Sequence, residues 1–329
     1  MQNLKNHLPG ILLALVIAII AYNLGLLIPV IGGPVFGILL GILLASVWAS
    51  PMVFRQGIKF TSKYILQLAV ILLGFDMNLA NIIKVGRESL IVLVVTLSAA
   101  FLIAYFVGKF LSIDQKLYTL IGVGTAICGG SAIAAASSAI EAEDQDISYS
   151  ISTIFLFNVI AVFLFPAIGH LLKLSDTGFG MWAGTAINDT SSVVAAGFSY
   201  SDVAGNFATI VKLTRSLMIV PVTLVLAILF SRMSGSGNKF NFAKVFPWFI
   251  LGFLLAAVIR STAVFPLDIT SGLAWAGKFL IIVAMAAIGL NTNVQSFIKA
   301  GPRALLLGAT TWVTVAMSSL AIQFFMRTL

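Results

Sequence analysis

Residues 184–197 read GTAINDTSSVVAAG, and this stretch places a run of polar side chains inside an apolar segment long enough to cross a bilayer. The run is Asn188, Asp189, Thr190, Ser191 and Ser192. A charged side chain at mid-bilayer costs about 2.5–3.5 kcal/mol on insertion scales, so such groups usually face a bundle interior or a water-filled cavity. The stretch therefore predicts a polar site inside a membrane-embedded helix bundle.

The composition agrees with a membrane location. Of 329 residues, 60% are hydrophobic and 9% are charged, whereas a soluble domain carries roughly a quarter charged residues. The net charge is +8, but the Lys and Arg residues are scattered between apolar segments, so we expect a lipid bilayer and no nucleic acid as partner. With one cysteine, Cys128, and two distant histidines, His7 and His170, we expect no disulfide, no metal site and no cofactor.

Eleven apolar segments of about 20 residues predict eleven transmembrane helices. They are 10–29, 33–50, 64–80, 89–109, 117–140, 149–172, 179–198, 205–231, 245–263, 271–290 and 303–326. The first has no small-residue cleavage site and is interpreted as a retained helix. With the N-terminus inside, twelve Lys and Arg residues fall in inner loops and four in outer loops. The positive-inside rule therefore predicts a cytoplasmic N-terminus and an external C-terminus. Because every loop is short, we expect residues 1–329 to form a single membrane domain.

Two internal echoes suggest repeats. GTAICGGSAIAAA (124–136) and GTAINDTSSVVAAG (184–197) share their first four residues at an offset of 60. GFDMNLANIIKVG (74–86) and GLNTNVQSFIKAG (289–301) match at an offset of 215. The second pair falls on opposite membrane faces, as inverted repeats require. The first pair lies on the fifth and seventh segments, which run in the same direction in this topology, so no single repeat unit explains both echoes.

The fifth segment predicts a broken helix. Its Cys128-Gly129-Gly130-Ser131 run weakens a helix, since Gly costs about 1 kcal/mol relative to Ala. A break inside the membrane presents the N-terminus of a half-helix, which is a ready anion site. Close packing through Gly122 and Gly124 is the structural alternative. The candidate substrate-binding residues of this segment are Thr125, Cys128, Gly129, Gly130 and Ser131.

The eighth segment adds two cations. Lys212 and Arg215 in ATIVKLTRSLMIVP are three residues apart and share a helix face. Asp189 is expected to pair with either one, which leaves a net positive cluster that an anionic substrate would neutralise. A purely structural ion pair is the alternative. Substrate-binding candidates are therefore Lys212, Arg215, Asn188, Thr190, Ser191 and Ser192. Asp189 is expected to carry a proton or to coordinate a coupling cation.

Other polar residues have structural interpretations beside functional ones. Asn158, in the sixth segment, is expected to make an interhelical hydrogen bond. Asp76 is expected at the end of the third helix and Asn291 and Asn293 at the end of the tenth, where both asparagines are also candidates for a coupling-ion site. The acidic loop 141–146 is expected outside, as a solvated turn.

The stretches GVGTAICGGSAIAA, GTAINDTSSVVAAG, VKLTRSLMIVP and IGLNTN resemble the YeiH-type bacterial membrane family (UPF0324), whose members carry the label sulfate exporter. That family is grouped with cation/proton antiporters and bile-acid symporters. The resemblance implies a bacterial cytoplasmic-membrane protein with one extra first helix and two inverted five-helix repeats, here about 33–172 and 179–326. It also implies core and panel domains, with two discontinuous helices crossing at the midplane. Those helices would be the fifth, at Cys128 to Ser131, and the tenth, around Ala286 to Asn293.

These observations favour a secondary transporter that moves a small anion, sulfate or a related oxyanion or sulfonate, by alternating access. Coupling to H⁺ or Na⁺ stays open, and export rests on the family label alone. A cation/proton antiporter using Asp189 is the second hypothesis. A passive channel and an intramembrane enzyme using Asp76 and Asp189 as a dyad are remoter ones, so we expect no enzymatic activity. Dimers are common among membrane transporters, and a homodimer is one expected assembly.

Overall fold

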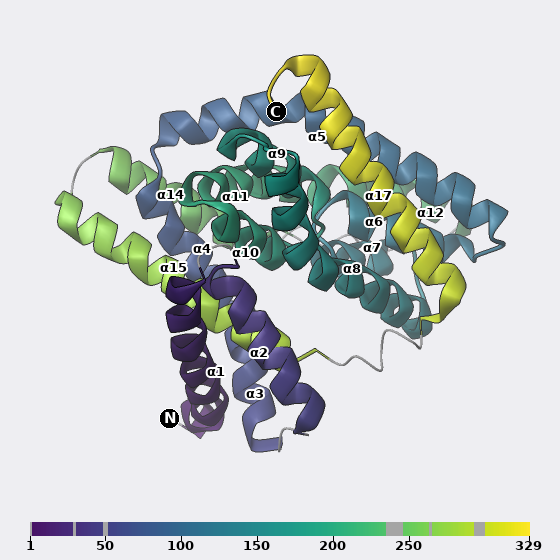
Figure 1. Cartoon of the computed structure of the whole chain (residues 1–329). Coiled ribbons are helices and arrows are strands. Elements are labelled where there is room, and N and C mark those ends of the chain that lie inside the picture. Colours follow the sequence, from purple (N-terminus) through teal and green to yellow (C-terminus); the bar gives the residue numbers. More distant parts are fainter. Residues whose placement is uncertain (1, 29–30, 49–51, 235–245, 263–264, 293–299) are drawn as a thin grey trace.

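A computed structural model describes residues 2–28, 31–48, 52–234, 246–262, 265–292 and 300–329, and within these ranges all its regular structure is helical, with no strand (Figure 1). Seven of the described helices are long and apolar enough to cross a membrane. Two shorter apolar helices, α2 (Gly33–Val47) and α14 (Phe249–Ser261), accompany them. The chain is therefore a multi-pass membrane protein. Each of the eleven expected segments coincides with helical structure, but two of them are not single passes.

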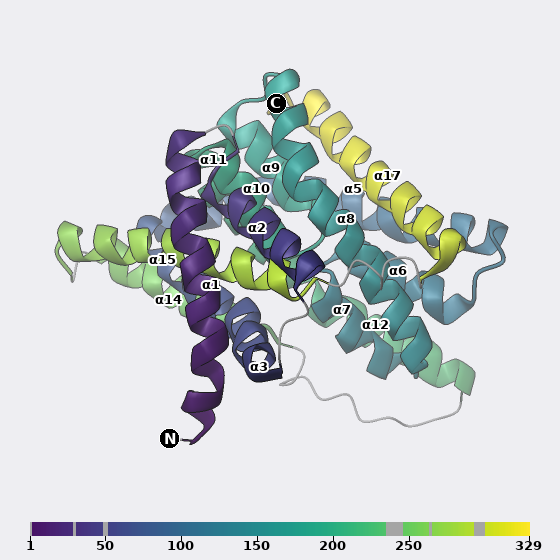
Figure 2. The same cartoon turned by 60° about the horizontal axis from the view of Figure 1, so that its bottom comes forward.

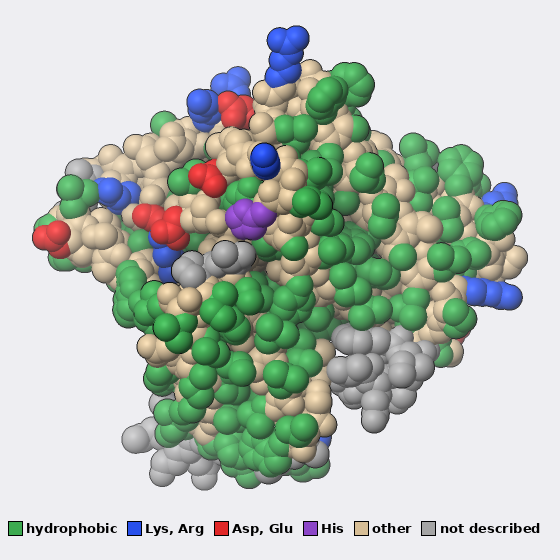
Figure 3. Space-filling view, viewed as in Figure 1, with side chains coloured by type: hydrophobic (Ala, Val, Ile, Leu, Met, Phe, Trp, Pro, Cys, Tyr) green, Lys and Arg blue, Asp and Glu red, His purple; other side chains and the backbone are tan. Residues whose placement is uncertain are grey.

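One group of helices forms a scaffold around α15 (Leu267–Leu290). It consists of α1 (Gln2–Leu27), α2, α14 and a continuous rod made of α3 (Met52–Phe60), the π-helical turn η1 (Thr61–Ile65), α4 (Leu66–Leu73) and the 3₁₀ turn η2 (Gly74–Asp76). The α2–α15 contact needs glycine, because a Cβ added at Gly289 would lie 2.4 Å from the Ile38 carbonyl oxygen. Hydrophobic side chains cover the lower part of the molecule in Figure 3, where α1 and α2 lie, as a lipid-facing surface requires.

The remaining helices form a second group. It contains α5 (Leu79–Phe110), α6 (Gln115–Ala126), α7 (Gly130–Ala139), α8 (Asp144–Leu171), α9 (Asp176–Ala186), α10 (Thr190–Tyr200), α11 (Asp202–Ser216), α12 (Ile219–Ser234) and α17 (Gly301–Met326). The four helices α6, α7, α9 and α10 have 10–12 residues each. At 1.5 Å per residue each is about 15–18 Å long, which is roughly half of a 30 Å hydrocarbon core.

The α6 and α7 helices form a hairpin that enters and leaves on one side, which we call hairpin 1. At its base, Lys116 Nζ in α6 donates to the carbonyl oxygen of Glu141, just after α7, at 2.7 Å. Closer to the tip, a Cβ at Gly124 in α6 would lie 2.8 Å from the side chain of Ile133 in α7. The two helices are therefore antiparallel, and the predicted single pass 117–140 is wrong. The predicted break is confirmed, since α6 ends at Ala126 and α7 begins at Gly130.

The α9 and α10 helices form hairpin 2 in the same way. At its base, Ser201 Oγ donates to Asp176 Oδ1 at 2.7 Å, and Tyr200 Oη donates to the Leu174 carbonyl oxygen at 2.6 Å. Helix α11 then runs antiparallel to α10 and beside α9, where a Cβ at Gly184 would meet Val211 at 2.7 Å. The predicted single pass 179–198 is therefore also wrong.

The hairpins approach from opposite ends of α8, which crosses once between them (Figure 2). This arrangement corrects the direction expected for the GTAI echo. Residues 124–127 end the first arm of hairpin 1 and residues 184–187 end the first arm of hairpin 2, and these arms run in opposite directions. Each hairpin follows one long helix, α5 or α8, so the offset of 60 marks a helix-plus-hairpin unit in inverted orientation. The five-helix repeats implied by the family resemblance stay a prediction.

Two further expectations change with the hairpins. The acidic loop 141–146 lies on the same side as Lys116, the inner side under the positive-inside rule, and Lys173 moves to the outer side. The bias of Lys and Arg then becomes eleven inside to five outside, which still favours a cytoplasmic N-terminus. The second discontinuous element, expected around Ala286 to Asn293, is not found at Ala286–Leu290, where α15 is continuous, and Asn293 lies outside the described residues. The second break lies at Ile187–Asp189 instead.

Candidate functional site

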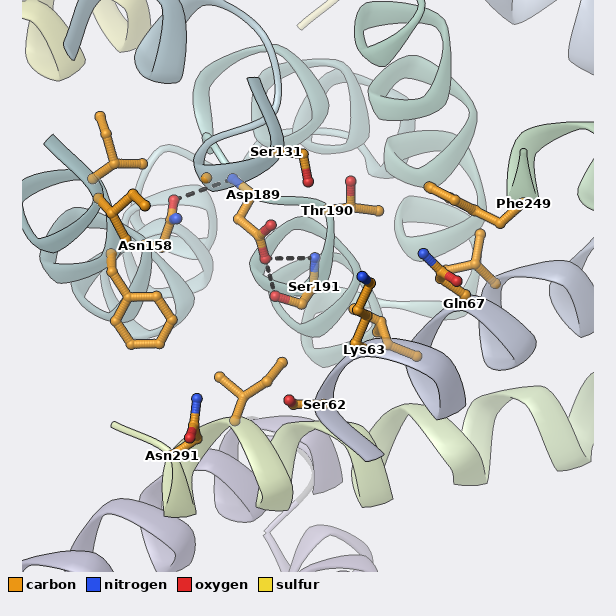
Figure 4. A pocket seen from close by; sticks show the side chains of 17 residues that line it. Ser62, Lys63, Gln67, Ser131, Asn158, Asp189, Thr190, Ser191, Phe249 and Asn291 are labelled. Atoms are coloured by element: carbon orange, nitrogen blue, oxygen red, sulfur yellow. Dashed lines mark hydrogen bonds between the residues drawn. The ribbon is translucent and has the colours of Figure 1, made fainter. Parts of the chain in front are cut away.

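The two hairpin tips meet at a cavity of about 320 Å³ (Figure 4). Its walls are the starts of α7 and α10, the first half of α8, the η1–α4 part of the rod, Phe249 of α14 and the end of α15. We call this cavity the pocket. Its polar lining side chains are Ser62, Lys63, Gln67, Ser131, Asn158, Asp189, Thr190, Ser191 and Asn291. Helices from both groups contribute, so any relative movement of the groups changes the pocket.

Two helix N-termini face the pocket. Helix α7 begins at Gly130 after Gly129, whose φ of 70° lies in the left-handed region that favours glycine. Gly129 offers no side-chain cap, and an added Cβ at Gly130 would meet nothing within 4 Å. Helix α10 begins at Thr190, and Ser191 also lines the pocket. Each N-terminus carries about half a positive charge, and first-turn N–H groups without a side-chain cap are ready donors to an anion.

Asp189 is held at the tip of hairpin 2 by short-range contacts. Its carboxylate caps α10 by accepting from the Ser191 backbone N–H at 3.0 Å, and it also accepts from the Ser191 hydroxyl. The Asp189 backbone N–H donates to Asn158 Oδ1 at 3.1 Å. The interhelical hydrogen bond predicted for Asn158 is thereby confirmed, and the same side chain lines the pocket.

Lys63 is a pocket residue that the sequence analysis missed, because it was counted only as a charge in an inner loop. It lies in the π-helical turn η1, and π-turns inside α-helices are frequent at functional sites. Figure 4 shows its side chain extending from the rod toward the tip of hairpin 2. The turn itself carried no sequence signal that we recognise.

Lys212 lies on the opposite side of the hairpin tips and does not line the pocket. Its side chain is fully buried. The ammonium donates to the carbonyl oxygens of Ile127 at 2.7 Å and Ile187 at 3.0 Å, and to that of Asn188. These carbonyls stand at the C-terminal ends of the first arms of both hairpins, where α-helices leave acceptors unpaired and carry partial negative charge.

Arg215 completes the same cluster from one helical turn further along α11. Its guanidinium donates from Nε to the Ala126 carbonyl oxygen at 2.6 Å, from Nη1 to that of Ile187 at 3.1 Å, and from Nη2 to that of Thr125. The five acceptor residues, which we call the carbonyl cluster, are Thr125, Ala126, Ile127, Ile187 and Asn188.

The expected ion pair between Asp189 and one of these cations is wrong. Among the described residues, the salt bridges do not include Lys212 or Arg215. Both donate to backbone carbonyls because two half-helix C-termini converge there, whereas the carboxylate of Asp189 turns to the start of its own helix. The surplus charge is therefore accommodated by peptide dipoles rather than by a side-chain anion.

The structure divides the candidate residues into two sets. Gly130, Ser131, Asp189, Thr190, Ser191 and Asn291 line the pocket. Thr125, Cys128, Gly129, Asn188, Ser192, Lys212 and Arg215 do not, and all seven are buried. Asn293 lies outside the described residues. Gly122 and Gly124 serve packing, since added Cβ atoms would lie 2.9 Å from Ala104 and 2.8 Å from Ile133.

A separate polar cluster joins the two helix groups at the other end of the rod. Lys278 of α15 contacts Asp202 of α11 at 3.0 Å and Asp76 of η2 at 3.4 Å, and Asn206 Nδ2 donates to Asp76 Oδ2 at 3.0 Å. The pocket is lined by the η1 end of the same rod. Ion pairs thus join the two helix groups at one end of the rod, and the pocket lies between the groups at the other end.

Comparisons with known proteins place the chain in a family. The profile described as "Conserved hypothetical protein 698" matches residues 9–308. A UPF0324 membrane protein of Streptococcus agalactiae is 45% identical, over 98% of this chain and 99% of its own. A second, from Streptococcus pyogenes, is 48% identical over 96% of both chains, and a third, from Fusobacterium nucleatum, is 44% identical over 97% and 98%.

Proposed function

The chain belongs to the UPF0324 family of membrane proteins, and from that premise and the pocket geometry we propose that it is a secondary transporter of a small anion. The substrate is sulfate or a related oxyanion or sulfonate. It binds between the N-termini of α7 and α10, with Lys63 as the facing cation. The proposed binding residues are Gly130, Ser131, Thr190 and Lys63, while both donors of Ser191 are engaged by Asp189.

The convergence of two helix N-termini on one cavity carries this proposal. The termini supply about +0.5 each, Lys63 supplies +1 and Asp189 supplies −1, so the pocket is positive by about one charge. Lys212 and Arg215 add no charge to this balance, because the carbonyl cluster compensates them. A small oxyanion fits a positive pocket, and its oxygens match convergent N–H and hydroxyl donors.

Alternating access is supported by a difference between the two ends of the contact between the helix groups, one open at the pocket and one closed at Lys278. The pocket opens to the surface, since its lining residues Lys63, Ser131 and Asn291 are exposed, while the Lys278 cluster joins the groups at the other end. Because the anion-binding tips lie in one group and Lys63 lies in the other, rocking of the groups exposes the site to each side in turn. We place the open mouth at the cytoplasmic side, following the Lys and Arg bias.

Flux of radiolabelled sulfate into proteoliposomes containing purified protein tests the proposal. We expect uptake that saturates with sulfate concentration, follows an imposed gradient and is competed by unlabelled sulfonate or oxyanion. Saturation distinguishes a transporter from a passive channel. The absence of gradient-dependent flux for every oxyanion tested, with folded protein verified by its melting transition, rejects the function.

The pocket carboxylate of Asp189 favours one second candidate, a cation/proton antiporter. In that case Asp189→Asn abolishes proton-coupled Na⁺ movement and sulfate is without effect. The positive balance of the pocket favours the anion. The aspartyl dyad required by the enzyme hypothesis has no counterpart among the described residues, because Asp76 contacts Lys278 while Asp189 lines the pocket.

A further inference from the structure

The ammonium of Lys212 has the surroundings of a bound monovalent cation. It is enclosed, with none of the side chain exposed, and its three N–H groups meet three carbonyl oxygens. One carbonyl, that of Ile127, comes from hairpin 1, and two, those of Ile187 and Asn188, come from hairpin 2. The ammonium therefore joins two re-entrant elements that enter from opposite sides of the membrane.

The three acceptors of this shell match the three donors of the charged form of Lys212. An ammonium has three donors and no acceptor, whereas a neutral amine would turn a lone pair toward one of the three carbonyl oxygens. A buried acceptor facing a lone pair is an unmade hydrogen bond. The geometry thus holds a positive charge at a fixed place between the tips.

In secondary transporters with interrupted helices, unwound carbonyls and half-helix C-terminal ends are the groups that coordinate a coupling Na⁺. The carbonyl cluster offers the same kind of ligand, and here a side chain of the protein occupies it. We propose that the Lys212 ammonium is a tethered substitute for a coupling Na⁺, so that the hairpins are joined, and the anion site is formed, without an inorganic cation. This inference states how cation coupling is replaced at the anion site, and it therefore rests on the proposed function.

The proposal is tested by removing the Lys212 ammonium and supplying an inorganic monovalent cation. Lys212→Ala opens a space lined by three carbonyl oxygens, which a small monovalent cation can enter. We expect its melting temperature in choline chloride to fall well below that of the unaltered protein. At equal ionic strength, NaCl or KCl should raise it by about 3 °C or more, because a ligand that binds only the folded state stabilises it.

Lys212→Met is the matched control, because it removes the charge but fills the space. It should be destabilised as well, with less than a third of the cation-specific recovery seen for Lys212→Ala. The unaltered protein should melt at the same temperature in NaCl, KCl and choline chloride. This last measurement needs no variant and holds even if both variants fail to fold.

Three results would overturn the inference. One is Na⁺-specific stabilisation of the unaltered protein, which requires an inorganic cation site beside Lys212. Another is a folded Lys212→Ala protein with no difference between NaCl, KCl and choline chloride. The third is equal recovery in Lys212→Met. Since melting needs no substrate, these results are independent of sulfate flux, and a failure of the transport proposal leaves them readable.

Discussion

The two faces of the hairpin tips arise from the same chain reversals, but they differ in how their backbone groups are paired. On one face, the carbonyl ends of α6 and α9 accept hydrogen bonds from the buried Lys212 and Arg215. On the other face, the amide ends of α7 and α10 open into the pocket, where an added Cβ at Gly130 would meet nothing. The negative poles of the half-helices are thus neutralised by Lys212 and Arg215, whereas the uncapped positive pole of α7 faces the cavity and that of α10 is capped there by Asp189.

This difference separates what holds the site together from what the site offers to a ligand. Buried charges that lose their partners are costly, whereas groups at a wet cavity exchange protein contacts for water. Substitutions on the carbonyl face should therefore act mainly on stability, and those on the amide face mainly on binding.

Arg215→Ala should have the largest effect, because it strips donors from three buried carbonyl oxygens at the junction of the hairpins. Since each buried acceptor left without a donor costs about 1–3 kcal/mol, we expect a loss of about 3–5 kcal/mol of stability, measured as a fall in the melting temperature of detergent-purified protein. Arg87→Ala, at an exposed arginine of α5, is the control and should change stability by less than about 0.5 kcal/mol. Equal melting of the two variants would show that the carbonyl cluster does not hold the tips.

Asp189→Asn should tighten anion binding while leaving the fold intact. Asparagine caps a helix about as well as aspartate, so the cost in stability stays below about 1 kcal/mol. Removing the negative charge should strengthen sulfate binding by roughly 30-fold, or about 2 kcal/mol. The sulfate dependence of the melting temperature measures the affinity. Weaker sulfate binding, together with loss of proton-coupled Na⁺ movement, would favour the antiporter instead.

Lys63→Gln should weaken sulfate binding by about tenfold, because it removes the cation that faces the two helix N-termini. The sulfate concentration that gives half-maximal thermal shift reports this change. Lys59→Gln, four residues earlier on the same rod and exposed, is the matched control and should bind as the unaltered protein does. Identical affinities in the two variants would remove Lys63 from the site.

Lys278→Gln should have the smallest effect. Its ion pairs are part-exposed, with 30% of the Lys278 side chain accessible, and such pairs contribute about 0.5–1 kcal/mol. Loss of this tie should favour the state in which the pocket mouth is closed. In a Cys128→Ala background, we expect Ser131→Cys to react a few-fold more slowly with a thiol reagent added at the mouth. Faster reaction would mean that Lys278 does not hold the mouth open.

Much of the fold was predictable from the sequence, but the hairpins were not. Hydropathy finds an apolar run of about 25 residues and does not distinguish one pass from an entry and a return. The break at Cys128–Gly130 was predictable from its glycines. The shared GTAI residues marked both tips, yet the assumption of full passes assigned them the same direction.

The site was predictable in its residue types and only partly in its pairings. Burial of Lys212 and Arg215 followed from their place in an apolar segment, and the polar run at Asn188–Ser192 pointed to the tip of hairpin 2. Their carbonyl partners could not be found, because every residue has a backbone carbonyl and only the fold decides which ones remain unpaired. Lys63 was missed for a related reason, since only the three-dimensional structure brings η1 to the tips.

The most direct test of the central claim is to locate an anion in the pocket. Selenate has the shape and charge of sulfate and gives an anomalous X-ray signal, so crystals of the protein soaked in selenate report the site itself. The account predicts a selenium peak between the first turns of α7 and α10, within reach of Ser131, Thr190 and Lys63. A pocket without selenium at saturating selenate, or a peak only at the protein surface, would contradict it.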